Sequence, residues 1–252
     1  MRTVAVVLAG GTGSRFGGSL PKQLRVLAGR TIIAHCVEAF SVAPGVDNVL
    51  VVTAADVADQ VRQEVSGFGK IADVITGGAS RSESTRCAIN WLNARFAPGA
   101  DCKVLFHDAA RPLVDQQTIA ECIQALDEWQ AVGTVVASAD TIVQVADGTI
   151  RRTLPRESLA RCQTPQGFRL PVISRAYELA SADPQFASVP ATDDCGVVLR
   201  YLPDVPIRTV AGNERNVKIT FSADIAIARA LLDMDAQASA PTGRGQSPGS
   251  HN

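Results

Sequence analysis

Short runs of apolar, largely β-branched residues alternate with stretches of helical character along the first half of the chain. The runs predict strands near residues 3–9, 49–53, 71–75, 103–107 and 132–137. The stretches between them predict helices near residues 31–40, 55–65, 82–95 and 116–129. Because these strands are apolar along most of their length, both faces of the sheet should be buried. The pattern therefore predicts an α/β fold with a doubly wound, mostly parallel sheet and helices on both faces.

The pattern changes after residue 138. Two short strands flank Asp147 and Gly148, a pair that favours a tight hairpin turn, so residues 138–160 or thereabouts should form a projecting β-hairpin arm. Helices near 171–181, 193–200 and 222–236 and a strand near 207–211 should complete a single domain over residues 1–236. Residues 237–252 are rich in Gly, Ser and Pro and are expected to form a disordered tail.

The charge balance and the cysteines exclude several classes of function. Lys and Arg number 24 against 25 for Asp and Glu, so no bulk positive field favours nucleic acid or a membrane surface. No apolar stretch is long enough to span a bilayer. The 6 cysteines show no zinc-ligand spacing, which favours free thiols in a reducing compartment. These observations predict a cytoplasmic protein that holds any anionic ligand locally.

The segment after the first predicted strand, residues 8–24, combines glycines with cations. Gly10, Gly11 and Gly13 allow backbone amides to approach a ligand, and Arg15 and Lys22 add positive charge beside those amides. This combination is typical of a loop that holds a polyphosphate. The alternative is a tight strand-to-helix turn that carries two solvated cations.

Two common phosphate-binding motifs are excluded. A dinucleotide fingerprint that starts at Gly11 requires glycine at position 16, where this chain has Phe16. A Walker loop requires Gly-Lys followed by Ser or Thr, whereas Lys22 lies in Pro-Lys-Gln. The segment therefore indicates neither NAD nor a P-loop nucleotide.

Six ordered segments carry a resemblance to one family. They are LAGGTGSR with the following PKQ, GGASRSEST (77–85), HDAARP (107–112), TPQGF (164–168), TDD (192–194) and NVKIT (216–220). In order and spacing they resemble the methylerythritol phosphate cytidylyltransferases and their ribitol phosphate relatives. The resemblance covers the chain except for its tail. It implies a Rossmann-like nucleotidyltransferase fold, CTP and a polyol phosphate as substrates, Mg²⁺ as cofactor, and a homodimer formed through the arm.

The resemblance assigns catalytic roles to four cations. Arg15 and Lys22 should stabilise charge on the α-phosphate and on the leaving pyrophosphate. Arg156 and Lys218 should grip the phosphate of the acceptor. The residues implied in nucleotide binding are Leu8, Ala9, Gly10, Gly11, Gly13, Gly77, Gly78, Arg81 and Ser84. Those implied in acceptor binding are Asp108, Ala109, Arg111, Arg156, Thr164, Thr192 and Lys218, with Asp193 assisting.

Two of these residues have alternative interpretations. Asp108 follows a predicted strand, where such a sheet binds ligands, and is expected to contact Mg²⁺ or substrate hydroxyls, although an aspartate there can also cap a helix. Arg156, with Arg151 and Arg152, can instead form a solvated basic edge of the arm. Cytosine offers an amino donor and carbonyl and ring-nitrogen acceptors, so backbone groups and a hydroxyl suffice to read it. This chain departs from the family at Ala79, where members often have an acidic residue.

The expected reaction requires no general base. A phosphate oxygen of the acceptor attacks the α-phosphorus of CTP, and a phosphate monoester, whose second pKa is about 6, is already largely ionised near neutral pH. The chain has 3 histidines. His107 alone lies beside the predicted site, where we expect it to shape the strand end rather than move protons.

The acceptor stays open between two polyol phosphates. The spelling of HDAARP and of the segment around Arg156 favours 2-C-methyl-D-erythritol 4-phosphate, and hence isoprenoid precursor synthesis. The LAGGTGSR spelling and the cysteine in TDDCGVV are compatible with D-ribitol 5-phosphate, the precursor of CDP-ribitol for teichoic acid or capsule. A hypothesis of another class is a catalytically silent nucleotide sensor, against which the full set of α-phosphate and acceptor cations argues.

Overall fold

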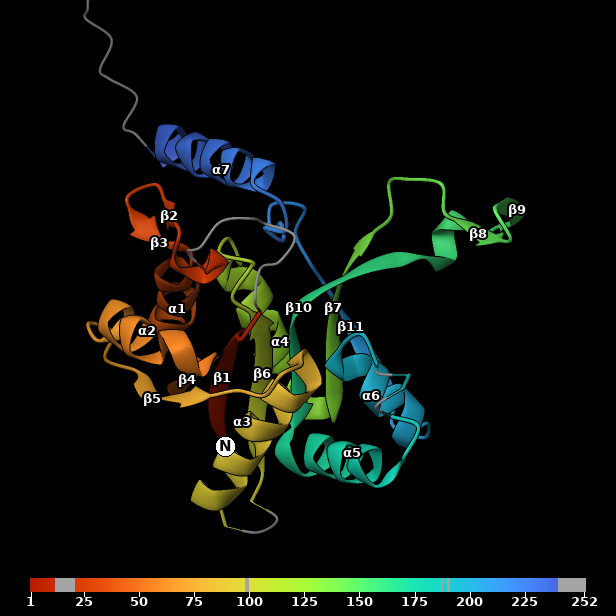
Figure 1. Ribbon diagram of the computed structural model, residues 1–252, viewed down its shortest axis with the longest axis horizontal. Helices are drawn as coiled ribbons and strands as arrows, with labels where there is room; N and C mark the ends of the chain where they lie inside the picture. Colours follow the sequence, from red (N-terminus) through yellow and green to blue (C-terminus); the bar gives the residue numbers. More distant parts are fainter. Residues whose placement is uncertain (12–20, 98–99, 187, 190, 240–252) are drawn as a thin grey trace, which may run out of the picture.

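The computed structural model describes residues 1–11, 21–97, 100–186, 188–189 and 191–239. Its centre is a seven-stranded sheet in the order β11-β7-β10-β6-β1-β4-β5 (Figure 1). These strands are β1 (Arg2–Ala9), β4 (Asn48–Thr53), β5 (Ile71–Thr76), β6 (Cys102–Asp108), β7 (Ala131–Ala137), β10 (Ala160–Arg169) and β11 (Ile207–Ala211). β1 lies between β4 and β6 and pairs parallel with both. The neighbouring pairs of the sheet are parallel except for the two that involve β10, which runs antiparallel to both β6 and β7.

Helices cover both faces of the sheet. On one face α1 (Ile32–Val42), α2 (Ala58–Val65) and α4 (Gln116–Glu128) pack against Ala5 and Val7 of β1. On the other face α3 (Arg81–Arg95), α5 (Leu170–Ala182) and α6 (Asp194–Tyr201) pack against Val4 and Val6. Successive residues of β1 therefore enter two different apolar cores, as a strand with two buried faces requires. The predicted doubly wound α/β fold is confirmed.

The predicted elements agree with the structure except at one strand. Each predicted strand and helix of the main sheet is present, with small differences at the ends, and α7 (Ala223–Ser239) continues three residues past the expected end at 236. Strand β10 was not predicted, because its sequence ARCQTPQGFR contains Pro165, Gly167 and several polar residues. Its polar side chains Gln163 and Gln166 are nevertheless buried. Residues 240–252 lie outside the described residues, so the disordered tail stays a prediction, as does the division into one domain.

Shorter elements surround the sheet. A 3-10 turn η1 (Lys22–Leu24) leads into a small hairpin of β2 (Val26–Leu27) and β3 (Arg30–Thr31), and a second turn, η2 (Ala55–Val57), precedes α2. Helix α7 packs on this hairpin through a third, small cluster that includes Leu27, Ile32, Ile219 and Ala228. The C-terminal segment is thus brought next to η1. No helix within the described residues is long and apolar enough to cross a bilayer.

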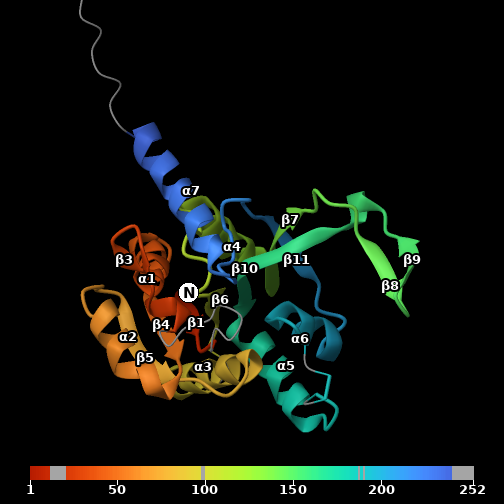
Figure 2. The same cartoon turned by 45° about the horizontal axis from the view of Figure 1, so that its top comes forward.

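The predicted arm is present. β8 (Val143–Ala146) and β9 (Thr149–Thr153) form a separate antiparallel hairpin that projects from the end of the sheet away from α7 (Figures 1 and 2). Asp147 and Gly148 have φ values of 50° and 70°, the conformation that the predicted Asp-Gly turn requires. The 3-10 turn η3 (Arg156–Ser158) leads back into β10.

Candidate active site

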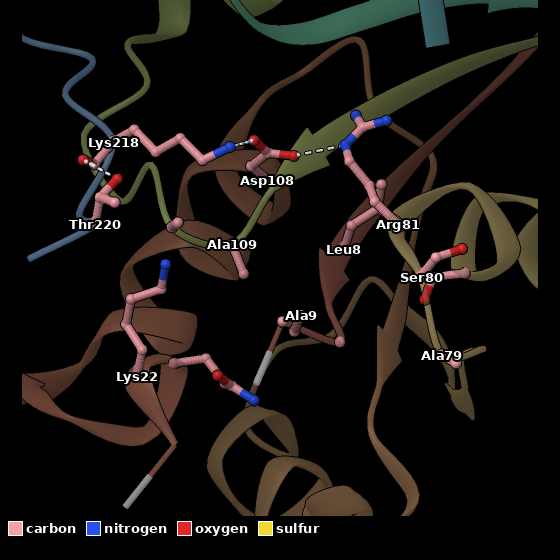
Figure 3. Close-up of a pocket in the computed structure, with 15 residues that line it drawn as sticks. Leu8, Ala9, Lys22, Ala79, Ser80, Arg81, Asp108, Ala109, Lys218 and Thr220 are labelled. Carbon is pink, nitrogen blue, oxygen red and sulfur yellow. Dashed lines mark hydrogen bonds and ion pairs between the residues drawn. The ribbon is translucent and has the colours of Figure 1, made fainter. Parts of the chain in front are cut away.

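A cavity of about 350 Å³ opens at the carboxyl ends of β1 and β6, where a doubly wound sheet binds its ligands (Figure 3). Strand β1 contributes Leu8 and Ala9, and β6 contributes Asp108. We call this the first cavity. Its lining residues are Leu8, Ala9, Gly10, Gly11, Lys22, Gln23, Ala79, Ser80, Arg81, Ser84, Asp108, Ala109, Ala110, Lys218 and Thr220.

Asp108 is the centre of the charge network in this cavity. Its Oδ1 lies 3.2 Å from Nε of Arg81, and its Oδ2 accepts a hydrogen bond of 2.7 Å from Nζ of Lys218 (Figure 3). Burial alone would raise the pKa of Asp108, but the two cations outweigh it and hold that pKa well below its usual range. Asp108 is therefore ionised at neutral pH. It caps no helix, since α4 begins later, at its own cap Asp115.

Arg81 connects Asp108 to a second carboxylate beneath the cavity. Its Nη2 lies 2.9 Å from Oδ2 of Asp194, a fully buried side chain at the start of α6. The Tyr177 hydroxyl donates to Oδ1 of Asp194 at 2.7 Å. Burial lowers the pKa of Arg81, but Asp194 and Asp108 outweigh that effect and raise it. The guanidinium is thus a permanent charge held by two anions.

Lys22 and Lys218 come from opposite ends of the chain and line the same cavity. Nζ of Lys22 donates a hydrogen bond of 2.8 Å to the backbone carbonyl of Ile219, next to Lys218. The backbone amide of Ile219 in turn donates to the carbonyl of Ala110 at 2.8 Å, which ties the C-terminal segment to the turn after β6. Two of the expected cations, one from each end of the chain, therefore lie at the same cavity.

The first turn of α3 forms another wall of the first cavity. Ser80 caps the helix by accepting a hydrogen bond from the amide of Glu83 at 3.1 Å. A Cβ at Gly77 would lie 2.5 Å from Oγ of Ser84, and one at Gly78 would lie 2.3 Å from Cβ of Glu83. These two glycines therefore allow the helix to approach the strand ends closely. The positive end of its dipole faces the cavity and favours an anion there.

A second cavity of about 210 Å³ adjoins the first. We call it the second cavity; it is lined by Arg81, Asp108, Arg111, Cys162, Gln163, Thr164, Gln166, Thr192, Asp193 and Lys218. Arg81, Asp108 and Lys218 line both cavities. A ligand in each would thus meet the other at this charged wall.

The second cavity is held together by hydrogen bonds between distant segments. The guanidinium of Arg111 donates to the carbonyls of Asn216, at 2.7 Å, and Cys162, at 3.3 Å. The side-chain amide of Asn216 donates to the carbonyl of Thr164 at 2.8 Å. Asp193 caps α6 by accepting from the amide of Gly196 at 2.8 Å. The backbone around the predicted acceptor residues is therefore fixed before any ligand binds.

Comparison with known proteins decides the family. The model of the family described as IspD, 2-C-methyl-D-erythritol 4-phosphate cytidylyltransferase, matches residues 3–234. The chain belongs to this cytidylyltransferase family. It is 50% identical over 238 residues to the 2-C-methyl-D-erythritol 4-phosphate cytidylyltransferase of Thermobifida fusca (strain YX), covering 92% of this chain and 93% of that relative.

Two further comparisons bear on the cytidylyltransferase fold and the acceptor. The crystal structure of 4-diphosphocytidyl-2C-methyl-D-erythritol synthase from Anaerococcus prevotii DSM 20548 superposes with a TM-score of 0.79 at 26% identity, covering 92% of this chain and 96% of that one. A bifunctional ribulose 5-phosphate reductase/CDP-ribitol pyrophosphorylase of Haemophilus influenzae is 34% identical over 92% of this chain, which spans 48% of that protein.

The structure brings together most, but not all, of the residues expected from the cytidylyltransferase resemblance. Gly13 and Arg15 lie outside the described residues. Gly77 and Gly78 lie behind the lining of the first cavity rather than in it. Arg156 lies on the arm, exposed, with its Nη2 3.2 Å from Oγ1 of Thr141, and it lines neither cavity of its own chain. The other expected residues line one cavity or both.

Asp108 is the one carboxylate that the first cavity offers to a metal. Within the described residues no group of three or more His, Cys, Asp or Glu side chains has metal-binding geometry. Mg²⁺ commonly binds one or two carboxylates together with substrate phosphates and water. The site therefore fits a cation that arrives with a triphosphate, and it does not fit one held by protein ligands alone.

Sequence reasoning missed the buried support of this cytidylyltransferase site. Asp194 and Tyr177 hold Arg81, and Gln166 accepts hydrogen bonds from the amides of Asp194 and Cys195, both at 3.1 Å. The adjacent Asp193 and Asp194 are typical of residues at the start of a helix. Nothing in the sequence distinguishes the half-buried capping residue Asp193 from the fully buried Asp194.

Proposed function

We propose that this enzyme transfers CMP from CTP to 2-C-methyl-D-erythritol 4-phosphate and releases pyrophosphate. The observation that carries the proposal is the wall of Arg81, Asp108 and Lys218 between two adjoining cavities. The identity with the Thermobifida fusca relative, over almost the full length of both proteins, supports the choice of acceptor. The reaction belongs to isoprenoid precursor synthesis.

CTP occupies the first cavity in this proposal. Backbone amides at Gly10 and Gly11 and the positive end of α3 lie against its phosphates. Lys22 stabilises the charge that develops at the α-phosphorus and on the leaving pyrophosphate, with Arg15 assisting by family resemblance. Ser84 and the backbone at Ala79 contact the base.

The acceptor occupies the second cavity, with its hydroxyls against Thr164 and Thr192 and its phosphate toward Lys218. One phosphate oxygen attacks the α-phosphorus, a new P–O bond forms, and the bond to the bridging oxygen of the pyrophosphate breaks. Because the two reactants are anions, the main contribution of the protein is to lower their repulsion and align them. No described histidine lines either cavity, in agreement with a reaction that requires no general base.

We also propose that a divalent cation, Mg²⁺, binds with CTP beside Asp108. When bound, it neutralises charge on the triphosphate. Asp108 binds the ion or substrate hydroxyls, and Arg81 and Lys218 keep the carboxylate ionised and oriented until the substrates enter.

A homodimer formed through the arm would supply Arg156 to the partner's second cavity. Three observations support it. Arg156 lines neither of the two cavities described, the arm projects from the sheet (Figure 1), and its side chains Val145 and Ile150 are 58% and 68% exposed. Isolated two-stranded hairpins with exposed apolar side chains gain stability by packing on another surface.

Pyrophosphate release from CTP tests the reaction directly. We expect release with 2-C-methyl-D-erythritol 4-phosphate, and background release without an acceptor. Release with D-ribitol 5-phosphate but not with the methylerythritol phosphate would replace the proposed acceptor and make the product CDP-ribitol, the compound in the name of the Haemophilus influenzae relative. An absence of release with either polyol phosphate would contradict the proposal and favour the nucleotide sensor.

A further inference from the structure

His107 is the penultimate residue of β6, directly before Asp108, and its side chain is fully buried. The ring of Phe40 packs on it edge to face, with centroids 5.0 Å apart. Within the described part of the chain its ring nitrogens contact the carbonyl of Arg111 and the hydroxyl of Thr164, and no carboxylate. A buried imidazole without an anionic partner is neutral.

The partners of His107 decide which nitrogen carries the proton. Nε2 lies 2.9 Å from the carbonyl oxygen of Arg111, which can only accept, so Nε2 is the protonated nitrogen. Nδ1 of a neutral ring then has only a lone pair. It lies 3.1 Å from Oγ1 of Thr164, so the Thr164 hydroxyl must donate its hydrogen to His107.

The remaining capacity of Thr164 follows by counting. A hydroxyl has one hydrogen and two lone pairs. The hydrogen is used by His107, and one lone pair accepts the backbone amide of Asp108 at 3.1 Å. One lone pair is left, and Thr164 lines the second cavity. Toward a ligand in that cavity, Thr164 can accept a hydrogen bond but cannot donate one.

We infer that His107 is a positioning residue that fixes Thr164 as a pure hydrogen-bond acceptor, so that the acceptor substrate must present a hydroxyl that donates to Thr164. The inference rests on the proposed function, because it assigns the second cavity to a polyol phosphate. It sets a rule of specificity. At the substrate carbon that faces Thr164, an alcohol is accepted. A ketone, ether or fluoride there is rejected, since its lone pair would face the lone pair of the Thr164 hydroxyl.

A spectroscopic test requires no turnover. Long-range ¹H–¹⁵N correlation of the full chain at pH 7.5 distinguishes the two tautomers of each histidine. With 3 histidines in the chain, the His107 signals are assigned by their loss in His107→Gln. We expect a neutral ring protonated at Nε2. Protonation at Nδ1, or at both nitrogens, would overturn the inference.

A set of acceptors with one hydroxyl at a time replaced by fluorine tests the rule of specificity. Fluorine has nearly the size of a hydroxyl but has no hydrogen to donate. At one position we expect fluorine to lower kcat/KM by about tenfold, the effect of one lost hydrogen bond. In Thr164→Val, which keeps the shape of the side chain, this difference should vanish. If fluorine lowers kcat/KM equally in the wild-type enzyme and in Thr164→Val, whichever hydroxyl it replaces, the inference is overturned.

Two substitutions of His107 separate its two hydrogen bonds. In His107→Asn the side-chain oxygen takes the place of Nδ1 and should still accept the hydrogen of the Thr164 hydroxyl. The loss of kcat/KM caused by fluorine should therefore persist. In His107→Gln the amide nitrogen donates to the carbonyl of Arg111 in place of Nε2, and the Thr164 hydroxyl is free to rotate and donate to the substrate. The loss of kcat/KM caused by fluorine should therefore be smaller. Equal losses of kcat/KM in the two variants would contradict the positioning role. If the wild-type enzyme shows no turnover with the unmodified polyol phosphate, the proposed function fails instead, and the tautomer measurement still stands.

Discussion

The cavities at the strand ends and the arm both have cationic side chains, but those of the cavities are held by ion pairs and those of the arm are exposed. Arg81 and Lys218 are fixed by ion pairs to Asp108, whose side chain is 12% exposed. Arg156 on the arm is exposed, and its guanidinium donates a hydrogen bond to the hydroxyl of Thr141. The wall of Arg81, Asp108 and Lys218 is complete within one chain, whereas Arg156 and the exposed apolar side chains of the arm line neither of the two cavities described. Preorganised charge lowers the cost of binding anions, and in the proposed dimer the arm would reach the same state against a second chain.

The largest expected effect concerns Lys22. Lys22→Ala removes a cation at the α-phosphate and should lower kcat by about a thousandfold. The side chain is partly exposed and donates to the backbone carbonyl of Ile219, so the free energy of unfolding should change by about 1 kcal/mol. Lys70→Ala is the matched control, since Nζ of Lys70 also donates to a backbone carbonyl, that of Ala43, but lines neither cavity. A large loss of stability in Lys22→Ala, absent from the control, would make Lys22 structural.

The second effect concerns the support beneath the cavity wall. Asp194→Asn leaves the buried guanidinium of Arg81 with one anion and should lower the free energy of unfolding by about 3 kcal/mol, measured by urea unfolding. Asp59→Asn breaks the exposed ion pair with Arg62 and should cost under about 1 kcal/mol. Equal losses in the two variants would show that Asp194 does not hold the wall.

The third effect is a dependence of stability on pH in the absence of CTP and divalent cations. Burial lowers the pKa of His107 from 6.5 to about 4. Between these values the unfolded chain binds more protons than the folded one, so stability should fall as the pH drops from 6.5 toward 4. The loss contributed by His107 is about 3 kcal/mol at most. Urea unfolding at a series of pH values measures it, and His107→Gln should flatten the slope. A slope that is unchanged in this variant would contradict the buried neutral state.

The smallest effect belongs to the arm. Arg156→Ala should lower kcat/KM for the acceptor by about tenfold to a hundredfold, because a charge-assisted contact to phosphate is lost. Stability should not change, since the side chain is exposed. Arg152→Ala, another exposed cation of the arm, is the control. An equal loss in both variants would indicate a general basic edge rather than a specific contact.

The sequence predicts the fold well where burial follows from apolar runs, as in β1 and β4. It fails at β10, whose burial comes from tertiary hydrogen bonds of Gln163 and Gln166 that no local pattern reports. Lys22, beside the glycines after β1, and Asp108, at the end of β6, are predictable from the residues around them. Arg81, Arg156 and Lys218, in contrast, are predicted by the family resemblance. Asp194 and Tyr177 are not, because a carboxylate that holds Arg81 from below has no spacing that distinguishes it from a helix cap.

Mixing two impaired variants, with the acceptor below its KM, tests most directly whether a cavity of one chain works with the arm of another. Lys22→Ala and Arg156→Ala chains are unfolded together, refolded and assayed by pyrophosphate release. If each site combines Lys22 of one chain with Arg156 of the other, every mixed dimer regains one intact site, and about a quarter of the wild-type activity returns. If Arg156 serves the cavities of its own chain, every site in the mixture keeps one defect. Activity no higher than that of the separate variants would then contradict the account.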